Sequence, residues 1–187
     1  MAYPLHLILT TRCNTTIKPW RIIIATHQFC TLGWLEESSR IYRANPTAKD
    51  KFKNLTVKIC FRVKCDPSWG ISEDIIFGAF FDRGELKTLK FFTEDEAFHE
   101  AEYLMVATPR AWKRILRKEH EFVTDLMLGK IKLELGTKVK MLDIALHLNN
   151  IFDFLTQVDL QFPDEMSADE LASYRSKMET LQRERGP

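Results

Sequence analysis

The sequence lacks an excess of charge of either sign. It has 27 Lys and Arg residues against 26 Asp and Glu residues, which gives a formal net charge of +1 at pH 7. Proteins that bind DNA or RNA usually carry a strongly basic surface, so we expect no nucleic-acid partner. The sequence also lacks an apolar run near the roughly 18 residues that a membrane-spanning helix needs. We therefore expect a soluble protein.

Cysteine is scarce, and none of the four cysteines belongs to a C-x-x-C pair. Cys60 and Cys65 are an odd number of positions apart, so a straight strand would place their side chains on opposite faces. We expect structural or free thiols rather than a disulfide or a metal site. We see no secretory signal pattern, and we therefore expect a cytoplasmic protein with reduced thiols.

Sequence signatures of the common enzyme classes are absent as well. There is no Gly-rich phosphate loop, no G-x-S-x-G and no H-E-x-x-H. Asp95 and His99 have the spacing of a metal pair on one helix, but no third ligand lies nearby, and a solvated acidic stretch is the simpler interpretation. His147 lies beside an apolar stripe, where we expect a satisfied hydrogen bond rather than a ligand contact. We expect no catalytic residue, no metal and no cofactor, and hence not an enzyme.

The chain changes character near Trp34. The first acidic residue is Glu36, and residues 1–33 show no clear periodicity, so we interpret them as an extension outside the domain. From Trp34 to Tyr42 apolar residues recur at helical spacing. Residues 55–63 then alternate apolar and polar side chains, which predicts a strand with one face in water. A nearly continuous apolar strand, 74–81, follows.

The middle of the chain alternates strands and helices. A hairpin turn at 82–85 leads into a return strand, 86–92. Residues 94–102 are acidic and predict a short crossing segment before the strand 102–108. Thr108 and Pro109 have the residue types of a helix N-cap and first helical position, and two helices over 109–119 and 121–128 follow.

Three further elements complete the pattern. Residues 130–135 read as a strand, and Gly136-Thr137 opens a long helix whose apolar residues recur at three and four up to Val158. Residues 163–187 form a C-terminal segment in which Ser167 and Glu170 match a capping box. The helix 167–184 carries a narrow apolar stripe, composed of Leu171, Tyr174, Met178 and Leu181.

Residues 34–162 resemble the sterol carrier protein-2 family. The resemblance rests on the order of the elements and on the segments Trp112-Lys-Arg-Ile-Leu-Arg-Lys-Glu-His-Glu-Phe and Leu126-Met-Leu-Gly-Lys-Ile-Lys-Leu. It implies an α+β fold, with a curved, mostly antiparallel five-stranded sheet covered by helices around an apolar cavity. The pair Gly136-Thr137 comes about one residue later than the family's usual pattern, which predicts a bulge or a shifted register in the preceding strand.

The resemblance also implies a function, the non-catalytic binding or transfer of a lipid in an internal cavity. The ligand would be a fatty acid, a fatty acyl-CoA, an isoprenoid or a sterol. Apolar side chains from the strands and the covering helices would line the cavity. The residues that we predict for this role are Phe77, Phe80, Leu104, Val106, Trp112, Leu116, Leu126, Leu133, Leu148, Ile151 and Phe152.

One dense basic patch falls on the helix 109–119. It consists of Arg110, Lys113, Arg114, Arg117 and Lys118. A solvated helix face is one interpretation. The other is contact with an anionic head group, either the phosphates of an acyl-CoA or a membrane surface touched transiently.

An alternative function remains open at this point. The same fold with a filled core would act as a protein-interaction or accessory module. The stripe on the helix 167–184 would then dock on a partner or form a homodimer.

Overall fold

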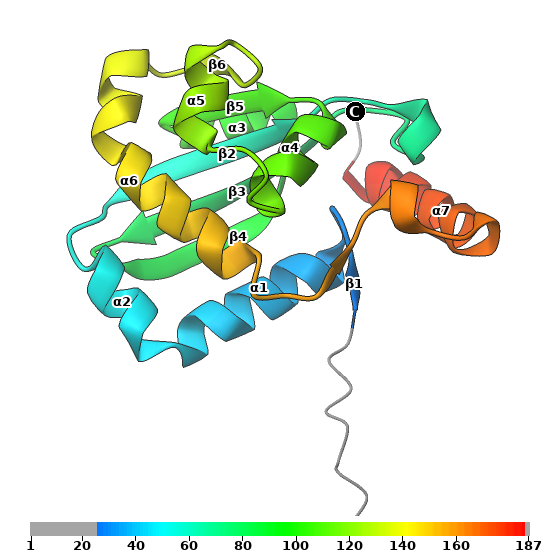
Figure 1. Cartoon of the computed structure of the whole chain (residues 1–187), viewed down its shortest axis with the longest axis horizontal. Coiled ribbons are helices and arrows are strands. Elements are labelled where there is room, and N and C mark those ends of the chain that lie inside the picture. The colour runs from blue at the N-terminus through cyan, green and yellow to red at the C-terminus, as the bar shows by residue number, and fades with distance from the viewer. Residues whose placement is uncertain (1–25, 186–187) are drawn as a thin grey trace, which may run out of the picture.

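The computed structural model describes residues 26–185, without the side chains of residues 48–49, 145–146 and 184–185. The described chain is α+β, as the sequence predicts (Figure 1). Its elements are β1 (His27–Gln28), α1 (Leu32–Ala44), α2 (Pro46–Phe52), β2 (Val57–Val63), η1 (Pro67–Trp69), β3 (Ile75–Asp82), β4 (Glu85–Phe92), α3 (Glu94–Glu100), β5 (Tyr103–Ala107), α4 (Pro109–Leu116), α5 (Phe122–Met127), β6 (Lys132–Leu135), α6 (Lys138–Leu155), β7 (Leu160–Gln161), η2 (Pro163–Glu165) and α7 (Ala168–Arg185).

Five strands form one open sheet in the order β4-β3-β2-β5-β6. β2 and β5 are parallel, and the other neighbouring pairs are antiparallel. The register between β5 and β6 shifts between Leu104, opposite Leu135, and Met105, opposite Leu133. Glu134 is therefore the extra residue of a bulge, which confirms the irregularity predicted from the late Gly136-Thr137 pair.

Local capping chemistry sets the ends of the helices. The Thr108 hydroxyl accepts from the backbone N–H of Ala111 at 3.3 Å, so Thr108 is the N-cap of α4, as predicted. Thr137 caps α6 in the same way, and Ser167 and Glu170 form the expected capping box at α7. These caps satisfy N–H groups that have no partner inside the helix.

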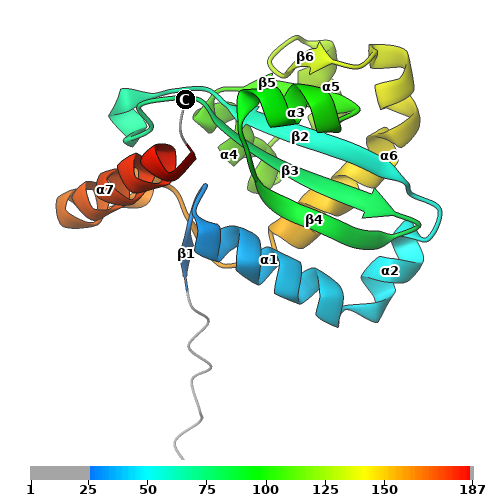
Figure 2. The same cartoon turned by 180° about the vertical axis from the view of Figure 1, so that it is seen from behind.

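The sheet has two different faces. The inner face is covered by α1, α4 and α6, while α3 lies on the outer face (Figures 1 and 2). Cys60 and Arg62 point outward from β2, yet they are 0% and 7% exposed. The prediction of one wet face is therefore wrong at the centre of β2, because α3 and its apolar neighbours cover that face.

Part of the expected N-terminal extension is built into the fold. β1 pairs in parallel with β7, with His27 opposite Leu160 and Gln28 opposite Gln161. Phe29 is fully buried, and its ring lies 5.1 Å from that of Phe162, centroid to centroid. Residues 1–25 of the extension lie outside the described residues.

α7 packs against its own chain. Tyr174 and Met178 are 0% and 1% exposed, and Leu171 and Leu181 are half-buried against the main core. The apolar stripe, which the alternative function requires to be free for a partner, is thus covered by the same chain, because the loop after β7 folds α7 back onto the domain (Figure 1). None of the described helices is both long and apolar enough to span a bilayer.

Candidate ligand-binding site

Most of the predicted lipid-binding residues lie together on the inner face. They are buried in the main core or packed against it, and they come from β3, α4, α5, β6 and α6. These residues are Phe77, Trp112, Leu116, Leu126, Leu133, Leu148, Ile151 and Phe152.

The structure separates the other three from this group. Phe80, Leu104 and Val106 belong to a second apolar cluster on the outer face, under α3. Side chains alternate along a strand, so Phe80, three positions after Phe77, points the opposite way. The inward residues of β5 are Tyr103, Met105 and Ala107 instead. One cavity in the main core cannot be lined by all eleven predicted residues, and this part of the prediction is corrected.

Aromatic rings fill the centre of the inner face. The Phe61 ring lies 5.1 Å from that of Phe77, 5.6 Å from that of Trp112 and 5.7 Å from that of Phe152. The Trp112 indole N–H donates to the Arg62 carbonyl oxygen at 3.0 Å, which fixes the ring between β2 and α6. Any apolar ligand that enters here must displace a ring.

A pocket of about 270 Å³ reaches this aromatic cluster from the side. It lies between the end of α4, the start of α5 and the last turns of α6, and we call it the α4–α6 pocket. Its lining consists of Ile115, Lys118, His120, Glu121, Phe122, Asn149, Phe152 and Asp153. The rings of Phe122 and Phe152 are 5.4 Å apart and both belong to this lining.

Sequence reasoning found little of this pocket. Of the predicted residues, only Phe152 and Lys118 line it. Phe122 follows the break between two helices, and Asn149 and Asp153 are one turn apart beside Phe152 on α6. That pattern could have indicated a helix face that is apolar at one side and polar at its edge.

The volume of the α4–α6 pocket limits what fits without rearrangement. A methylene group is close in size to a water molecule, which occupies about 30 Å³ in the liquid. A pocket of 270 Å³ therefore holds roughly nine methylene groups. Ligand pockets usually span about 300 to 1,000 Å³. A long acyl chain therefore requires the Phe152 ring to move.

The rim of the α4–α6 pocket is polar. The Lys118 ammonium lies 2.8 Å from an Asp153 carboxylate oxygen across the opening, and both side chains are about half exposed or more. Lys118 has a φ of +58°, in the left-handed region where glycine is the usual residue at the end of a helix. A lysine in this conformation carries a backbone cost of roughly 1 kcal/mol.

A buried carboxylate supports the same rim from below. Asp125 is 1% exposed, and its Oδ1 contacts His120 Nδ1 at 3.1 Å and the Lys130 ammonium at 3.2 Å. Burial raises the pKa of the Asp125 carboxyl, but the hydrogen bonds and charges of His120 and Lys130 outweigh it, and the pKa lies below its ordinary value. The ionised Asp125 thus holds the His120 ring at the pocket.

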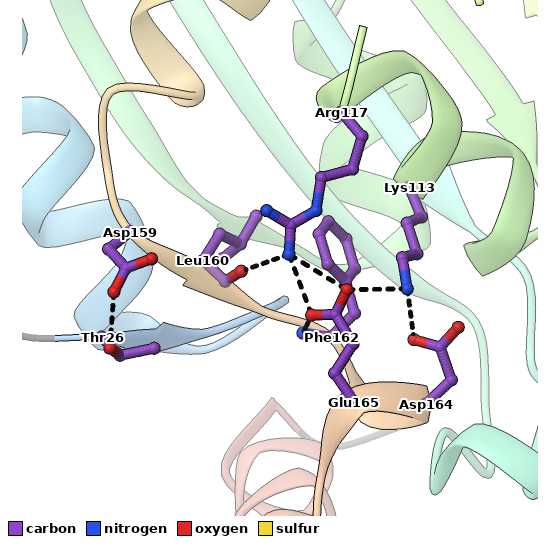
Figure 3. Close-up of polar contacts among 8 residues, drawn as sticks. All are labelled: Thr26, Lys113, Arg117, Asp159, Leu160, Phe162, Asp164 and Glu165. Atoms are coloured by element: carbon purple, nitrogen blue, oxygen red, sulfur yellow. Dashed lines mark hydrogen bonds and ion pairs between the residues drawn. The ribbon is translucent and has the colours of Figure 1, made fainter. Parts of the chain in front are cut away.

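The predicted basic patch is largely occupied by carboxylates of the same chain. Lys113 contacts Asp164 at 2.7 Å and Glu165 at 2.9 Å, and Arg117 donates to Glu165 and to the Leu160 carbonyl oxygen (Figure 3). Glu165 also accepts from the backbone N–H of Phe162. We call these contacts the α4 clamp, because they fasten the segment 160–165 to α4.

The α4 clamp changes the interpretation of that patch. Burial lowers the pKa of Lys113, but Asp164 and Glu165 raise it by more than burial lowers it. The pKa of Lys113 therefore lies above its ordinary value. Arg110 stacks over the Trp69 ring at 5.6 Å, and Lys118 pairs with Asp153. Arg114 is exposed and has no ion pair among the described residues. The cations of α4 thus serve mainly internal contacts.

The sequence analysis did not identify the buried cation Arg62. Arg62 contacts Glu94 at 2.7 Å, Glu134 at 3.3 Å and Asp74 at 3.7 Å on the outer face. The bulge at Glu134 brings that carboxylate towards Arg62. This cluster ties α3, β6 and the start of β3 to the central strand, and none of its members borders the α4–α6 pocket.

A larger hollow, about 760 Å³, lies between β1, the start of α1 and α7. It is broadly open and lined by mixed side chains, among them His27, Gln161 and Lys177. It does not touch the predicted lipid-binding residues. We therefore place the candidate site at the α4–α6 pocket.

The Asp95–His99 spacing, which we interpreted as a solvated acidic stretch, does not assemble a metal site in the described chain. Both residues lie on the helix α3. The His99 Nδ1 atom contacts the Asp95 backbone oxygen at 2.8 Å, so this ring nitrogen is not paired with the Asp95 carboxylate. Residues 26–185 contain no group of three His, Cys, Asp or Glu side chains that could hold a metal ion. His147 is half-buried beside the Phe52 ring, at 6.4 Å between centroids. Its Nδ1 is buried without a hydrogen-bond partner among the described residues, so the prediction of a satisfied hydrogen bond is wrong for this atom.

Comparison with solved structures identifies the fold. A crystal structure of sterol carrier protein 2 superposes with a TM-score of 0.60 at 20% identity, covering 68% of this chain and 97% of that one. The solution structure of a Thermus thermophilus protein, described as possibly a sterol carrier protein, gives a TM-score of 0.61 at 20% identity and covers 70% of this chain and 90% of that one.

Sequence comparison adds nothing to this likeness. No family model matches the chain, and no curated protein matches it. The element order, the mixed five-stranded sheet and the two superpositions together give this chain a sterol carrier protein-2-like fold.

Proposed function

We propose that this protein binds a lipid non-covalently through the α4–α6 pocket and has no catalytic role. The ligand is an apolar chain or ring system, namely a fatty acid, a fatty acyl-CoA, an isoprenoid or a sterol. The observation that carries the proposal is a pocket lined by the Phe122 and Phe152 rings and open to solvent, with a lysine in the same lining. The sterol-carrier-like fold supports it as an analogy.

The ligand enters by moving the Phe152 ring. Phe152 borders the pocket on one side and the rings of Phe61 and Trp112 on the other. Turning this one side chain joins the pocket to the inner core, where Leu148 and Leu116 extend the apolar surface. Each methylene that leaves water contributes about 0.8 kcal/mol, and this gain offsets the lost ring contacts.

Lys118 is the residue that we assign to an anionic head group. It alone of the predicted basic residues lines the pocket. Its left-handed backbone conformation is costly, and such strain commonly persists where a side chain has a function. A fatty-acid carboxylate or an acyl-CoA phosphate would compete with Asp153 for the ammonium group.

Blocking the pocket mouth tests this assignment. Asn149 is exposed on α6 and lines the pocket, so Asn149→Trp should fill the opening without disturbing the core. The control is Asp143→Trp, exposed on the same helix outside the pocket lining. Binding of palmitic acid, palmitoyl-CoA, farnesol and cholesterol is measured by native mass spectrometry and by displacement of a fluorescent fatty acid.

The two variants give a clear decision. The proposal expects Asn149→Trp to weaken binding at least tenfold and Asp143→Trp to leave it unchanged. Equal binding by both variants, with the wild type still binding lipid, would place the ligand elsewhere in the fold. Turnover of a bound lipid into a product would overturn the non-catalytic assignment.

A further inference from the structure

A buried carboxylate sets the orientation of one histidine in the α4–α6 pocket. His120 lines the pocket, and its side chain is 32% exposed. Asp125 is 1% exposed and does not belong to the lining, and its Oδ1 atom lies 3.1 Å from His120 Nδ1. The other ring nitrogen, Nε2, points away from that contact and has no hydrogen-bond partner among the described residues. Nε2 is therefore the nitrogen of His120 that is available to a ligand.

The contact with Asp125 also decides which nitrogen of His120 carries the proton. Burial raises the pKa of Asp125, but the hydrogen bonds and charges of His120 and Lys130 lower it by more, so this carboxyl is ionised at neutral pH. An ionised carboxylate has no hydrogen to donate, and the hydrogen of the contact must lie on Nδ1. A neutral imidazole with its proton on Nδ1 has a lone pair on Nε2. Nε2 is thus an acceptor, and it favours a ligand that can donate.

Backbone hydrogen bonds hold both members of this pair in place. The His120 N–H donates to the Arg114 carbonyl oxygen of α4 at 3.3 Å. The Asp125 carbonyl oxygen accepts from the N–H groups of Lys130 and Ile131 at 2.9 and 3.1 Å. The Lys130 ammonium also lies 3.2 Å from Asp125 Oδ1. The acceptor in the pocket is therefore preorganised, because the groups that orient it are themselves fixed.

The charges of the pocket lining favour a ligand without charge. Besides the histidine, the lining has one cation, Lys118, and two carboxylates, Glu121 and Asp153. Lys118 already contacts Asp153 at 2.8 Å, so an anionic ligand must displace that carboxylate before it reaches the ammonium group. An uncharged head group leaves the ion pair intact.

We infer that His120 Nε2 accepts a hydrogen bond from the hydroxyl group of an uncharged chain alcohol in the α4–α6 pocket. The chain of such an alcohol lies against the Phe122 and Phe152 rings of the same lining. Lys118 remains the contact for anionic ligands, which bind more weakly. The assignment rests on the proposed function, and it names the ligand class that the pocket prefers. Asp125 is a positioning residue, because it acts on the ligand only through His120.

Nitrogen-15 NMR spectroscopy tests the proton position directly. Full-length labelled protein is measured at about pH 8, where histidine is ordinarily neutral. Couplings from the ring carbon hydrogens to the two nitrogens distinguish a proton on Nδ1 from one on Nε2, and His120→Gln identifies the signals of this residue. We expect the proton on Nδ1. A proton on Nε2 would overturn the inference, because that nitrogen would then be a donor.

Calorimetric titration tests the choice of ligand. The probes are 1-decanol, decyl methyl ether and decanoic acid, whose shared chain is close to the roughly nine methylene groups that 270 Å³ holds. His120→Asn keeps an N–H that can reach Asp125 and removes Nε2, whereas His120→Gln keeps an acceptor near the position of Nε2. His99→Asn is the matched control, since His99 is exposed on α3 and outside the lining. Unchanged thermal unfolding confirms that each variant is folded.

The results separate this inference from the proposed function. We expect the wild type to bind 1-decanol about three- to tenfold more tightly than the ether, which is the effect of one hydrogen bond between uncharged groups, and more tightly than decanoic acid. His120→Asn should bind the alcohol and the ether equally, while His120→Gln and His99→Asn should keep the preference. A preference that survives in His120→Asn, no preference in the wild type, or tighter binding of decanoic acid would overturn the inference and leave lipid binding intact. A wild type that binds none of the three probes would overturn both.

Discussion

Replacing Glu165 with Gln should loosen the α4 clamp and reveal what the basic patch does. The substitution keeps an oxygen that accepts from the Phe162 N–H, and it removes the charge that faces Lys113 and Arg117 (Figure 3). Fully buried bonds to a charged group contribute about 1.5 to 3 kcal/mol each, and exposed ion pairs about 0 to 1. Because a third of the Glu165 side chain is exposed, we expect a loss of about 1–2 kcal/mol at pH 7.

The loss should depend on pH in a defined direction. Burial raises the pKa of Glu165, but the Phe162 N–H, Lys113 and Arg117 together lower it by more than burial raises it. The folded pKa of Glu165 therefore lies below the unfolded value of about 4.3. The contribution is present in full above about pH 4.3 and is lost as the pH falls through the folded pKa. The difference between wild type and variant should therefore shrink as the pH falls below the unfolded pKa and through the folded one.

Urea unfolding at pH 7 and at low pH measures both quantities. Glu179→Gln is the matched control, since Glu179 is exposed on α7 and has no ion pair in the described chain. A difference below about 0.3 kcal/mol at pH 7, or one that persists unchanged at low pH, would refute the clamp. The cations of α4 would then be free to meet an external anion, as first predicted from the sequence.

Three further predictions concern single sites. Tyr174→Phe should stabilise the fold by about 1 kcal/mol in urea unfolding, because the buried hydroxyl has no partner among the described residues; destabilisation would mean that the hydroxyl is bonded. Gly136→Ala should destabilise by at least about 2 kcal/mol, since φ is +94° and an added Cβ would lie 2.5 Å from Tyr103; an unchanged melting temperature would contradict that geometry. Cys65 is exposed and should react quickly with a thiol reagent. Burial raises the pKa of Cys60 to about 12, so Cys60 should stay unreactive until the protein unfolds. Mass mapping of the labelled protein measures both, and labelling of Cys60 in the folded protein would contradict the prediction.

Local patterns in the sequence were sufficient for much of the fold. The N-caps Thr108 and Thr137 and the capping box at Ser167 depend on residues within one turn, so the sequence alone predicts them. The hairpin at Arg83-Gly84 forms for the same reason, with φ values of +47° and +76°. The bulge at Glu134 was predictable because the strand before Gly136 has one residue more than the family pattern, and a regular strand pairing leaves no partner for it.

The candidate site depended on contacts that no local pattern contains. Apolar periodicity marks burial, so it grouped Phe80 with Phe77 although the two lie on opposite faces of β3. The partner of Lys113 is about fifty positions away in sequence, at Asp164, and a charge count could not reveal it. The buried state of Arg62 likewise depends on carboxylates from three distant elements.

The Tyr174 stripe illustrates a related limit. An amphipathic helix at the end of a chain has the same sequence pattern whether it covers its own core or a partner. Here Tyr174 and Met178 are buried within the chain, and the interaction-module alternative is not favoured by the structure.

Native mass spectrometry of gently purified protein tests the central proposal most directly. The protein is analysed as isolated and after incubation with palmitic acid, palmitoyl-CoA, farnesol and cholesterol, and any adduct is identified by lipid extraction. The account predicts a one-to-one complex with at least one of these lipids, and loss of that complex in Asn149→Trp. Protein that stays free of ligand after every incubation would contradict it and would mean that the aromatic core around Phe152 remains closed.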